Sequence, residues 1–195
     1  MKARLALLAT MCVVVVLNAC GDPTSLKASA ATSVDTLYVF ALSGTPPSYP
    51  SGLSLLVGQA VPVNVFLNGF PAFDVAFDID TDGNAIVYPV KLVIPSPGSR
   101  PVGLLKFGTP FETVLEAPAT GYELDSAFVV SPGETLVVRS QHNISQDVCQ
   151  FALNPYLYSK IAVDSVSLAS RTIYLKLGLD PNCGFRSFAT GVPTN

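Results

Sequence analysis

The segment "FDIDTDGNAIVYP", residues 77–89, decides which fold class suits the chain. Apolar and polar residues alternate before Asp82 and Gly83, and a second apolar run follows them. Alternation with a period of two predicts a half-buried strand, and an Asp-Gly pair between two such runs is the strongest short-range signal for a β-hairpin. The segment therefore predicts two antiparallel strands joined by a tight turn at Asp82 and Gly83.

A two-residue turn also predicts the register of the hairpin, because Thr81 would then face Asn84. The pairs that follow on one face are all apolar: Ile79 with Ile86, Phe77 with Tyr88, Val75 with Val90, and Phe73 with Leu92. Apolar cross-strand pairs that share a face are typical of a sheet that covers a core. The same register turns three aspartates toward solvent, namely Asp74 (opposite Lys91), Asp78 and Asp80.

The spacing of Asp78, Asp80 and Asp82, followed by Gly83, also resembles the first half of an EF-hand calcium loop. Such a loop needs a bidentate acidic ligand at its twelfth position, and counting from Asp78 that position is Pro89. We therefore expect no metal site, and the three aspartates are retained only as a weak alternative set of ligands. The matching alternative function is a calcium-stabilised adhesin module.

Proline and turn residues divide the rest of the chain into short segments. The sequence contains 16 prolines and 14 glycines, and because proline disrupts helix interiors, long helices are nearly excluded before residue 132. Apolar runs rich in β-branched and aromatic residues predict strands at 34–42, 53–57, 61–67, 73–80, 85–94, 102–107, 112–117, 127–130, 135–140, 158–168 and 172–179. About ten short strands predict an all-β domain over residues 34–195, an antiparallel β-sandwich with a barrel as the alternative.

Two segments, "LLVGQAVPVNV" at 55–65 and "VVSPGETLVVR" at 129–139, resemble bacterial immunoglobulin-like repeats. In each, a glycine followed by Gln or Glu (Gly58 and Gly133) sits in the turn that leads into a core strand. The resemblance implies an Ig-like sandwich. Two small Ig-like units divided near residue 118 are the alternative, and one larger sandwich is preferred because no linker separates the halves.

The N-terminus has the layout of an export signal. Lys2 and Arg4 precede an uncharged apolar run at residues 5–17, which is typical of a secretory signal peptide and shorter than the roughly 20 apolar residues of a membrane-spanning helix. The run ends in "LNAC", residues 17–20, which resembles the cleavage box of bacterial lipoproteins. That resemblance implies a signal peptide at 1–19 and a lipid on the sulfur of Cys20. Ordinary signal cleavage after Ala30 is the alternative.

Lipidation implies a location and a partner. The mature protein would be held to a membrane of the bacterial cell envelope, with residues 20–33 as the lipidated cysteine and a flexible tether. Loss of Lys2 and Arg4 leaves nine basic residues against fourteen acidic ones, so the net charge falls from −3 to −5. An acidic domain without a basic stripe is not expected to bind nucleic acid.

The cysteine count agrees with export. Cys12 leaves with the signal peptide and Cys20 takes the lipid, so Cys149 and Cys183 remain as a pair. In an oxidising compartment such a pair predicts a disulfide, with two free thiols as the alternative. Zinc is not expected, because the one histidine, His142, does not complete a tetrahedral site with these two cysteines.

No arrangement of residues predicts catalysis or a cofactor. His142 lies in the polar stretch "RSQHNIS", residues 139–145, and is expected to be an exposed loop residue, and no G-x-S-x-G nucleophile motif is present. We therefore expect a non-enzymatic binding or structural domain whose partner is an unknown protein or glycan. A small envelope hydrolase centred on His142 is the alternative. Aromatic rings can stack on sugars, and Tyr49, in the loop "GTPPSYPSG" at 44–52, is the ring expected to project.

Overall fold

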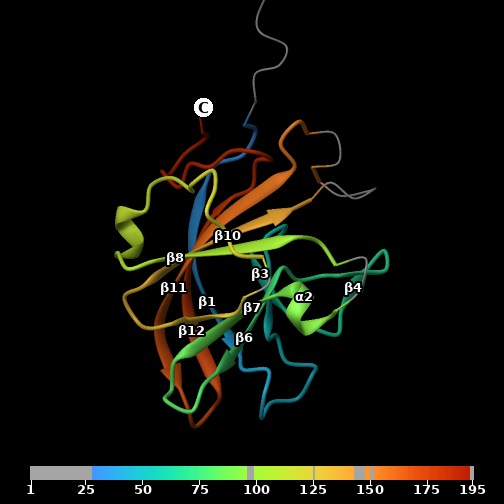
Figure 1. The fold of residues 1–195 in the computed structure, drawn as a ribbon, viewed down its shortest axis with the longest axis vertical. Coiled ribbons are helices and arrows are strands. Elements are labelled where there is room, and N and C mark those ends of the chain that lie inside the picture. The colour runs from blue at the N-terminus through green and yellow to red at the C-terminus, as the bar shows by residue number, and fades with distance from the viewer. Residues whose placement is uncertain (1–27, 96–98, 125, 143–147, 150–151, 194–195) are drawn as a thin grey trace, which may run out of the picture.

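The chain forms a β-sandwich. The computed structural model describes residues 28–95, 99–124, 126–142, 148–149 and 152–193. Within these ranges two five-stranded antiparallel sheets pack face to face, and a two-stranded ribbon lies at one side (Figure 1). The all-β class and the antiparallel sandwich predicted from the sequence are confirmed. The predicted signal peptide and the predicted lipidation site, Cys20, lie outside the described residues.

The first sheet has the strand order β1-β12-β11-β10-β8. Its strands are β1 (Ser33–Phe40), β8 (Val102–Phe107), β10 (Thr135–Gln141), β11 (Tyr156–Ser167) and β12 (Thr172–Asp180). The long hairpin of β11 and β12 turns at residues 168–171, and Arg171 there adopts a positive φ of 53°.

The second sheet has the strand order β3-β2-β6-β7-β9. Its strands are β2 (Gly52–Ser54), β3 (Gln59–Val61), β6 (Val75–Ile79), β7 (Ala85–Pro89) and β9 (Phe128–Val130). The remaining elements are the ribbon of β4 (Phe66–Leu67) and β5 (Phe70–Pro71), the helical turn α2 (Val90–Val93) and the 3-10 turn η1 (Phe111–Thr113). Strands from both sides of residue 118 occur in each sheet, so that residue does not separate one sheet from the other.

Several predicted strands are shorter than expected or absent, and three of them differ most. The segment 112–117 contains η1 in place of a strand, and the second half of 85–94 forms α2. The segment 61–67 is split into β3 and β4, because Pro62 has no N–H to continue the ladder. A proline also precedes each of the two helical turns that replace predicted strand residues: Pro89 precedes α2 and Pro110 precedes η1.

The core lies between the sheets and uses alternate residues of each strand. On β12 the side chains of Ile173, Leu175, Leu177 and Leu179 are buried. Across from them β6 and β7 contribute buried Val75, Phe77, Ile79, Ala85 and Val87. One continuous apolar cluster joins the two sets, as the face-to-face packing of two sheets requires.

The predicted hairpin is present, but its predicted register is wrong. Ile79 pairs with Ala85, Phe77 with Val87 and Val75 with Pro89, so each expected pair is shifted by one residue. As a result Ile79 and Ile86 lie on opposite faces of the sheet. Every residue of β7 is apolar ("AIVYP"), so alternation on that strand did not distinguish the two registers.

The turn has three residues instead of two. The N–H of Asp80 donates to the carbonyl of Asn84 (3.0 Å), which leaves residues 81–83 as the loop. The Asp80 carboxylate accepts the N–H groups of Asp82 (2.9 Å) and Asn84 (2.8 Å), and Gly83 has a φ of 87°. A three-residue loop that ends in a left-handed glycine is a standard alternative to the two-residue hairpin.

The described N-terminal segment is bound to the body of the domain. The N–H groups of Ser29 and Ala30 donate to the side-chain oxygen of Asn182 at 2.8 and 3.0 Å. Thr32 pairs with Gly191. The predicted flexible tether over residues 20–33 is therefore too long, because its last five residues are held in place. Both chain ends leave from the same end of the sandwich (Figure 1).

We expect Gly83→Ala to lower the free energy of unfolding by about 1–2 kcal/mol, because an L-residue is strained in the left-handed region. Asp82→Ala is the matched control, since Asp82 does not adopt a positive φ and its exposed side chain should be replaceable within about 0.5 kcal/mol. Urea denaturation of both variants tests this. Equal stability of Gly83→Ala and the wild type would contradict the turn described here.

Candidate functional site

The side chain of Asp74 is 0% exposed and contacts three other polar side chains in the interior. Its Oδ1 atom lies 3.0 Å from Nη1 of Arg100, 2.5 Å from Oγ of Ser140 and 3.2 Å from Nε2 of His142. Its Oδ2 atom accepts the N–H of Leu55 at 2.7 Å. Asp74 immediately precedes β6 and Leu55 immediately follows β2, so the carboxylate connects the second sheet to the first sheet, where Ser140 lies on β10.

The charges around Asp74 decide its ionisation. Burial by itself opposes the charged form, but the hydrogen bond and charge of His142, the charge of Arg100 and the hydroxyl of Ser140 outweigh it, so the pKa of Asp74 lies well below its ordinary value. Arg100 is fixed by a second hydrogen bond, from Nη2 to the carbonyl of Pro71 at 3.1 Å. A buried carboxylate is tolerated when it is paired and hydrogen-bonded in this way.

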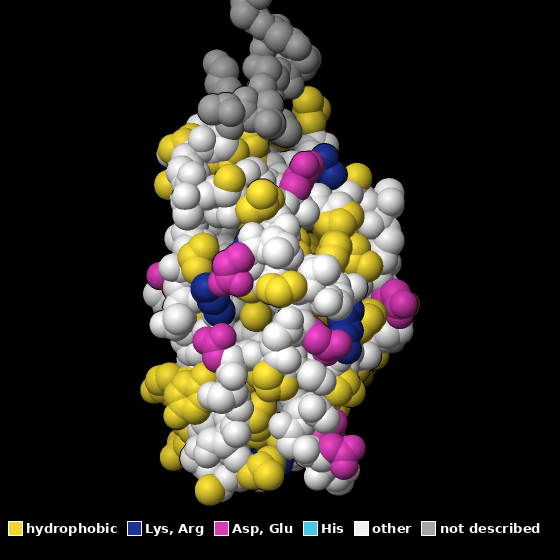
Figure 2. All heavy atoms as spheres, turned by 90° about the vertical axis from the view of Figure 1, so that its left-hand side faces the viewer, with side chains coloured by type: hydrophobic (Ala, Val, Ile, Leu, Met, Phe, Trp, Pro, Cys, Tyr) yellow, Lys and Arg dark blue, Asp and Glu magenta, His cyan; other side chains and the backbone are white. Residues whose placement is uncertain are grey.

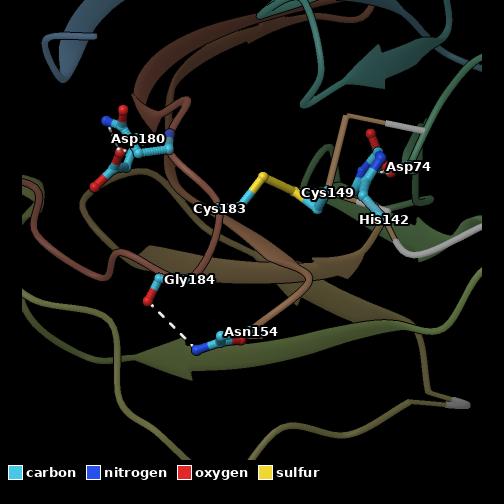
Figure 3. The surroundings of a disulfide bond; sticks show 8 residues. Asp74, His142, Cys149, Asn154, Asp180, Cys183 and Gly184 are labelled. Carbon is cyan, nitrogen blue, oxygen red and sulfur yellow. Dashed lines mark hydrogen bonds and ion pairs between the residues drawn. A yellow bond between two sulfur atoms is a disulfide. The ribbon is translucent and has the colours of Figure 1, made fainter. Parts of the chain in front are cut away.

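Two expectations about these residues are wrong. Asp74 was predicted to face solvent opposite Lys91, and His142 was predicted to be an exposed loop residue, yet both side chains are 0% exposed. Figure 3 shows Asp74 and His142 turned toward each other. Ser140 and His142 follow Asp74 by 66 and 68 residues in the sequence, so no local pattern predicted these contacts.

The geometry of this cluster differs from that of a hydrolytic triad. In a Ser-His-Asp enzyme the histidine lies between the other two groups and takes the serine proton. Here the carboxylate lies between them, and the Ser140 hydroxyl donates to Asp74. Ser140, His142 and Asp74 are all 0% exposed, which leaves no surface on which a substrate would meet the serine.

The hairpin aspartates are occupied by protein partners. Oδ1 of Asp78 accepts from the guanidinium of Arg171 (2.9 Å) and from the Ser43 hydroxyl (2.7 Å). Asp80 binds the backbone of its own turn, and this hydrogen bonding lowers its pKa. Among the described residues, no group of three or more His, Cys, Asp or Glu side chains is placed to hold a metal ion.

The predicted disulfide between Cys149 and Cys183 is present, with Cα atoms 5.7 Å apart. It joins the segment that follows β10 to the segment that follows β12 (Figure 3). Two further bonds connect the same segments, since Gly184 N–H donates to the carbonyl of Tyr156 (2.8 Å) and Asn154 Nδ2 donates to the carbonyl of Gly184 (3.4 Å). The end of the domain near both termini is therefore cross-linked.

The outer face of the first sheet is covered over one half. Residues 108–124 and the C-terminal segment pack there, and Val114, Ala117 and Phe188 form a second apolar cluster against Val137 and Tyr158. Beneath them, Nζ of the buried Lys160 donates to the carbonyls of Phe111 and Val114 at 2.7 and 2.8 Å. Loss of water around Lys160 lowers its pKa.

The other half of that face carries a row of aromatic rings, which we call the aromatic strip: Tyr174, Tyr38, Phe40 and Tyr49. Successive ring centroids are 6.3, 5.7 and 4.7 Å apart. Tyr38 and Tyr174 are cross-strand partners on β1 and β12 and are 53% and 46% exposed, while Tyr49 is 43% exposed. Tyr49 thus contributes to a surface on the sheet and does not project alone.

A hollow of about 190 Å³ lies beside the strip and is open to solvent. It is lined by Thr36, Leu37, Tyr38, Asp164, Tyr174 and Leu175. Asp164 is the extra residue of a bulge in β11, where the pairing with β12 shifts between Val163 and Ser165. Bulges commonly redirect one side chain at a functional surface. Figure 2 shows hydrophobic side chains on both the upper and the lower part of the face that it draws.

Comparisons of the chain with protein-family models, with curated proteins and with solved structures gave no match. Within the described ranges, no helix is both long enough and apolar enough to cross a bilayer. The geometry of the aromatic strip and of the Asp74 cluster therefore carries the functional interpretation.

We expect Asp74→Asn to lower the free energy of unfolding by about 3–5 kcal/mol at pH 7, because Arg100 would lose a buried partner. The folded-state pKa of Asp74 is below the unfolded value of about 3.9. The contribution of the carboxylate is therefore complete above that pH and is lost as the pH falls through the folded-state value.

Urea denaturation from pH 7 to pH 2 checks this. The difference between wild type and Asp74→Asn should shrink below about pH 4. Asp35→Asn, at an exposed position on β1, is the matched control and should change little. A difference that stays constant with pH would contradict the assignment.

The disulfide should contribute about 3.5–4 kcal/mol, since it closes a loop of 34 residues. We expect the double variant Cys149→Ser/Cys183→Ser to lose this amount in denaturant unfolding. Wild-type protein in reducing agent should match the double variant. Unchanged stability under both conditions would show that the bond does not constrain the unfolded chain.

Proposed function

We propose that the protein is a lipoprotein of the bacterial envelope whose β-sandwich binds a partner without catalysis. The proposed lipid anchor rests on the "LNAC" box, residues 17–20, at the end of an uncharged apolar run. The contacts of Ser29 and Ala30 with Asn182 support cleavage before Cys20. Cleavage after Ala30 would remove two residues that the folded domain binds.

The dimensions of the domain suit this arrangement. Ser29 follows Cys20 by nine residue steps, which span at most about 30 Å when fully extended, so the end of the sandwich that holds both termini stays near the bilayer. The aromatic strip begins at Tyr38, five residues along β1, or roughly 17 Å farther out. The exposed rings would then face away from the membrane that holds the protein.

The contacts of His142, Asp78 and Asp80 favour a binding role over a hydrolase or a calcium-stabilised adhesin module. A hydrolase centred on His142 needs that side chain in contact with a substrate, and His142 is completely buried beside Asp74. A calcium-stabilised adhesin needs free carboxylates in the hairpin, and Asp78 and Asp80 already bind Arg171 and the turn. The aromatic strip offers an exposed surface for a partner.

We expect Cys20→Ser to abolish acylation and to release the protein from the membrane fraction, because the thioether to the lipid requires the cysteine sulfur. Metabolic labelling with an alkyne fatty acid, followed by fractionation, measures both. Cys12→Ser is the matched control and should retain label and membrane association. Label on the Cys20→Ser protein, or a mature N-terminus at Ala31 by mass spectrometry, would overturn the proposal.

A further inference from the structure

We propose that the aromatic strip and its hollow bind a polysaccharide, with one sugar ring seated in the hollow between Tyr38 and Tyr174. The inference rests on the proposed function, since it names the ligand class of the same outward-facing surface. Hexose rings present C–H groups on one face and hydroxyl groups around the edge. A site for them combines aromatic faces with a few polar groups, and this surface has both.

The rings form an extended row, and their planes are tilted by 51°, 90° and 57° from one ring to the next. Four of them follow one another from β12 across β1 to the loop at Tyr49, with the distances given above. The positive C–H groups of a sugar are attracted to the negative face of an aromatic ring. Because the row is longer than a single ring, it suits a chain of sugars better than a free monosaccharide.

The exposure of Tyr38 and Tyr174 supports a binding role for the aromatic strip. Tyr38 and Tyr174 lie on the outer face of the sheet and are about half exposed, at positions where a domain without a ligand would gain solubility from polar residues. Elsewhere on the same outer face, aromatic residues are covered, as Tyr158 and Phe188 are. Large exposed apolar patches on a monomer are often functional.

The polar groups of the hollow select for uncharged or amino-bearing sugars. The Asp164 carboxylate and the Thr36 hydroxyl line it, and a carboxylate accepts hydrogen bonds from adjacent sugar hydroxyls or from an ammonium group. Among the described residues, no lysine or arginine lines the hollow, and the nearby Lys176 is engaged in a salt bridge with Glu112. Anionic sugars would meet Asp164 without a compensating cation.

Size favours a glycan over a protein partner. A stable protein interface covers about 800 Å² on each side, with large anchors inserted into pockets. The hollow of about 190 Å³ is smaller than the pockets of about 300–1,000 Å³ that hold drug-sized ligands. A volume of this size fits one sugar ring, and the rest of the strip extends along the surface as a chain would.

The mature lipidated protein in detergent is sedimented with three insoluble probes: cellulose, chitin and purified peptidoglycan. We expect at least one to retain the wild type. Tyr38→Ala and Tyr174→Ala should each weaken retention by about threefold to tenfold, the range of an aromatic contact. Phe66→Ala, at an exposed aromatic position on the ribbon, is the matched control and should bind as the wild type does. Thermal unfolding of each variant confirms that it is folded.

A second variant reports on stacking directly. The chain contains no tryptophan, so Tyr174→Trp introduces a single tryptophan, whose emission is excited selectively over that of the tyrosines. Titration with cellohexaose and chitohexaose should shift its emission to shorter wavelength and protect it from acrylamide, while Phe66→Trp should not respond. Asp164→Asn in the Tyr174→Trp background should weaken the response, because the carboxylate would no longer accept from two hydroxyls.

The outcomes separate this inference from the proposed function. If no probe retains the wild type while Cys20 is acylated, the carbohydrate site is wrong and the anchored binding domain stands. Binding that Tyr38→Ala and Tyr174→Ala leave unchanged would also overturn the site. A protein crosslinked through a photoreactive residue at position 174, and lost in Tyr38→Ala, would replace the glycan with a protein partner. Loss of acylation in the wild type itself would overturn the proposed function.

Discussion

The buried carboxylate of Asp74 is the constraint on which the packing of the two sheets depends. It accepts from Leu55 on its own side and from Ser140 and Arg100 across the interface. A charge in the interior is costly unless every partner is in place. These partners come from segments that are up to 68 residues away along the chain. The sandwich must therefore be assembled in one relative arrangement before the charge is compensated, which penalises alternative packings of the same strands.

The strands were predictable because residues close to each boundary in the sequence determine where a strand begins and ends. Gly, Pro, Asn and Asp separate runs of β-branched and aromatic residues, and the segment 102–107 was predicted with both ends correct. The hairpin register was not predictable, because β7 is apolar at every position and either face of it can be buried. The three-residue turn depends on the Asp80 carboxylate, which binds the backbone of Asp82 and Asn84.

The sequence predicted some of the candidate site residues and missed others. The disulfide was predicted by elimination, since only Cys149 and Cys183 remained to pair. The burial of Asp74 and His142 was missed because period-two alternation assigns a face and says nothing of a distant partner. The strip was missed because Tyr38 and Tyr174 alternate with aliphatic residues in "LYVFAL" and "IYLKL". On β1 the residues near Tyr38 are apolar on both faces, so alternation on that strand does not reveal which side remains exposed.

The attachment of β1 has a mechanical consequence. On the proposed anchoring, a pull from the membrane enters through Ser29 and runs along β1, while a ligand on the strip holds β12 and the far end of β1. The eight paired positions of β1 and β12 have hydrogen bonds perpendicular to that direction. The load is therefore shared as shear by the whole ladder and does not unzip it bond by bond. A domain tethered in this way resists extension under tension between a cell surface and a bound matrix.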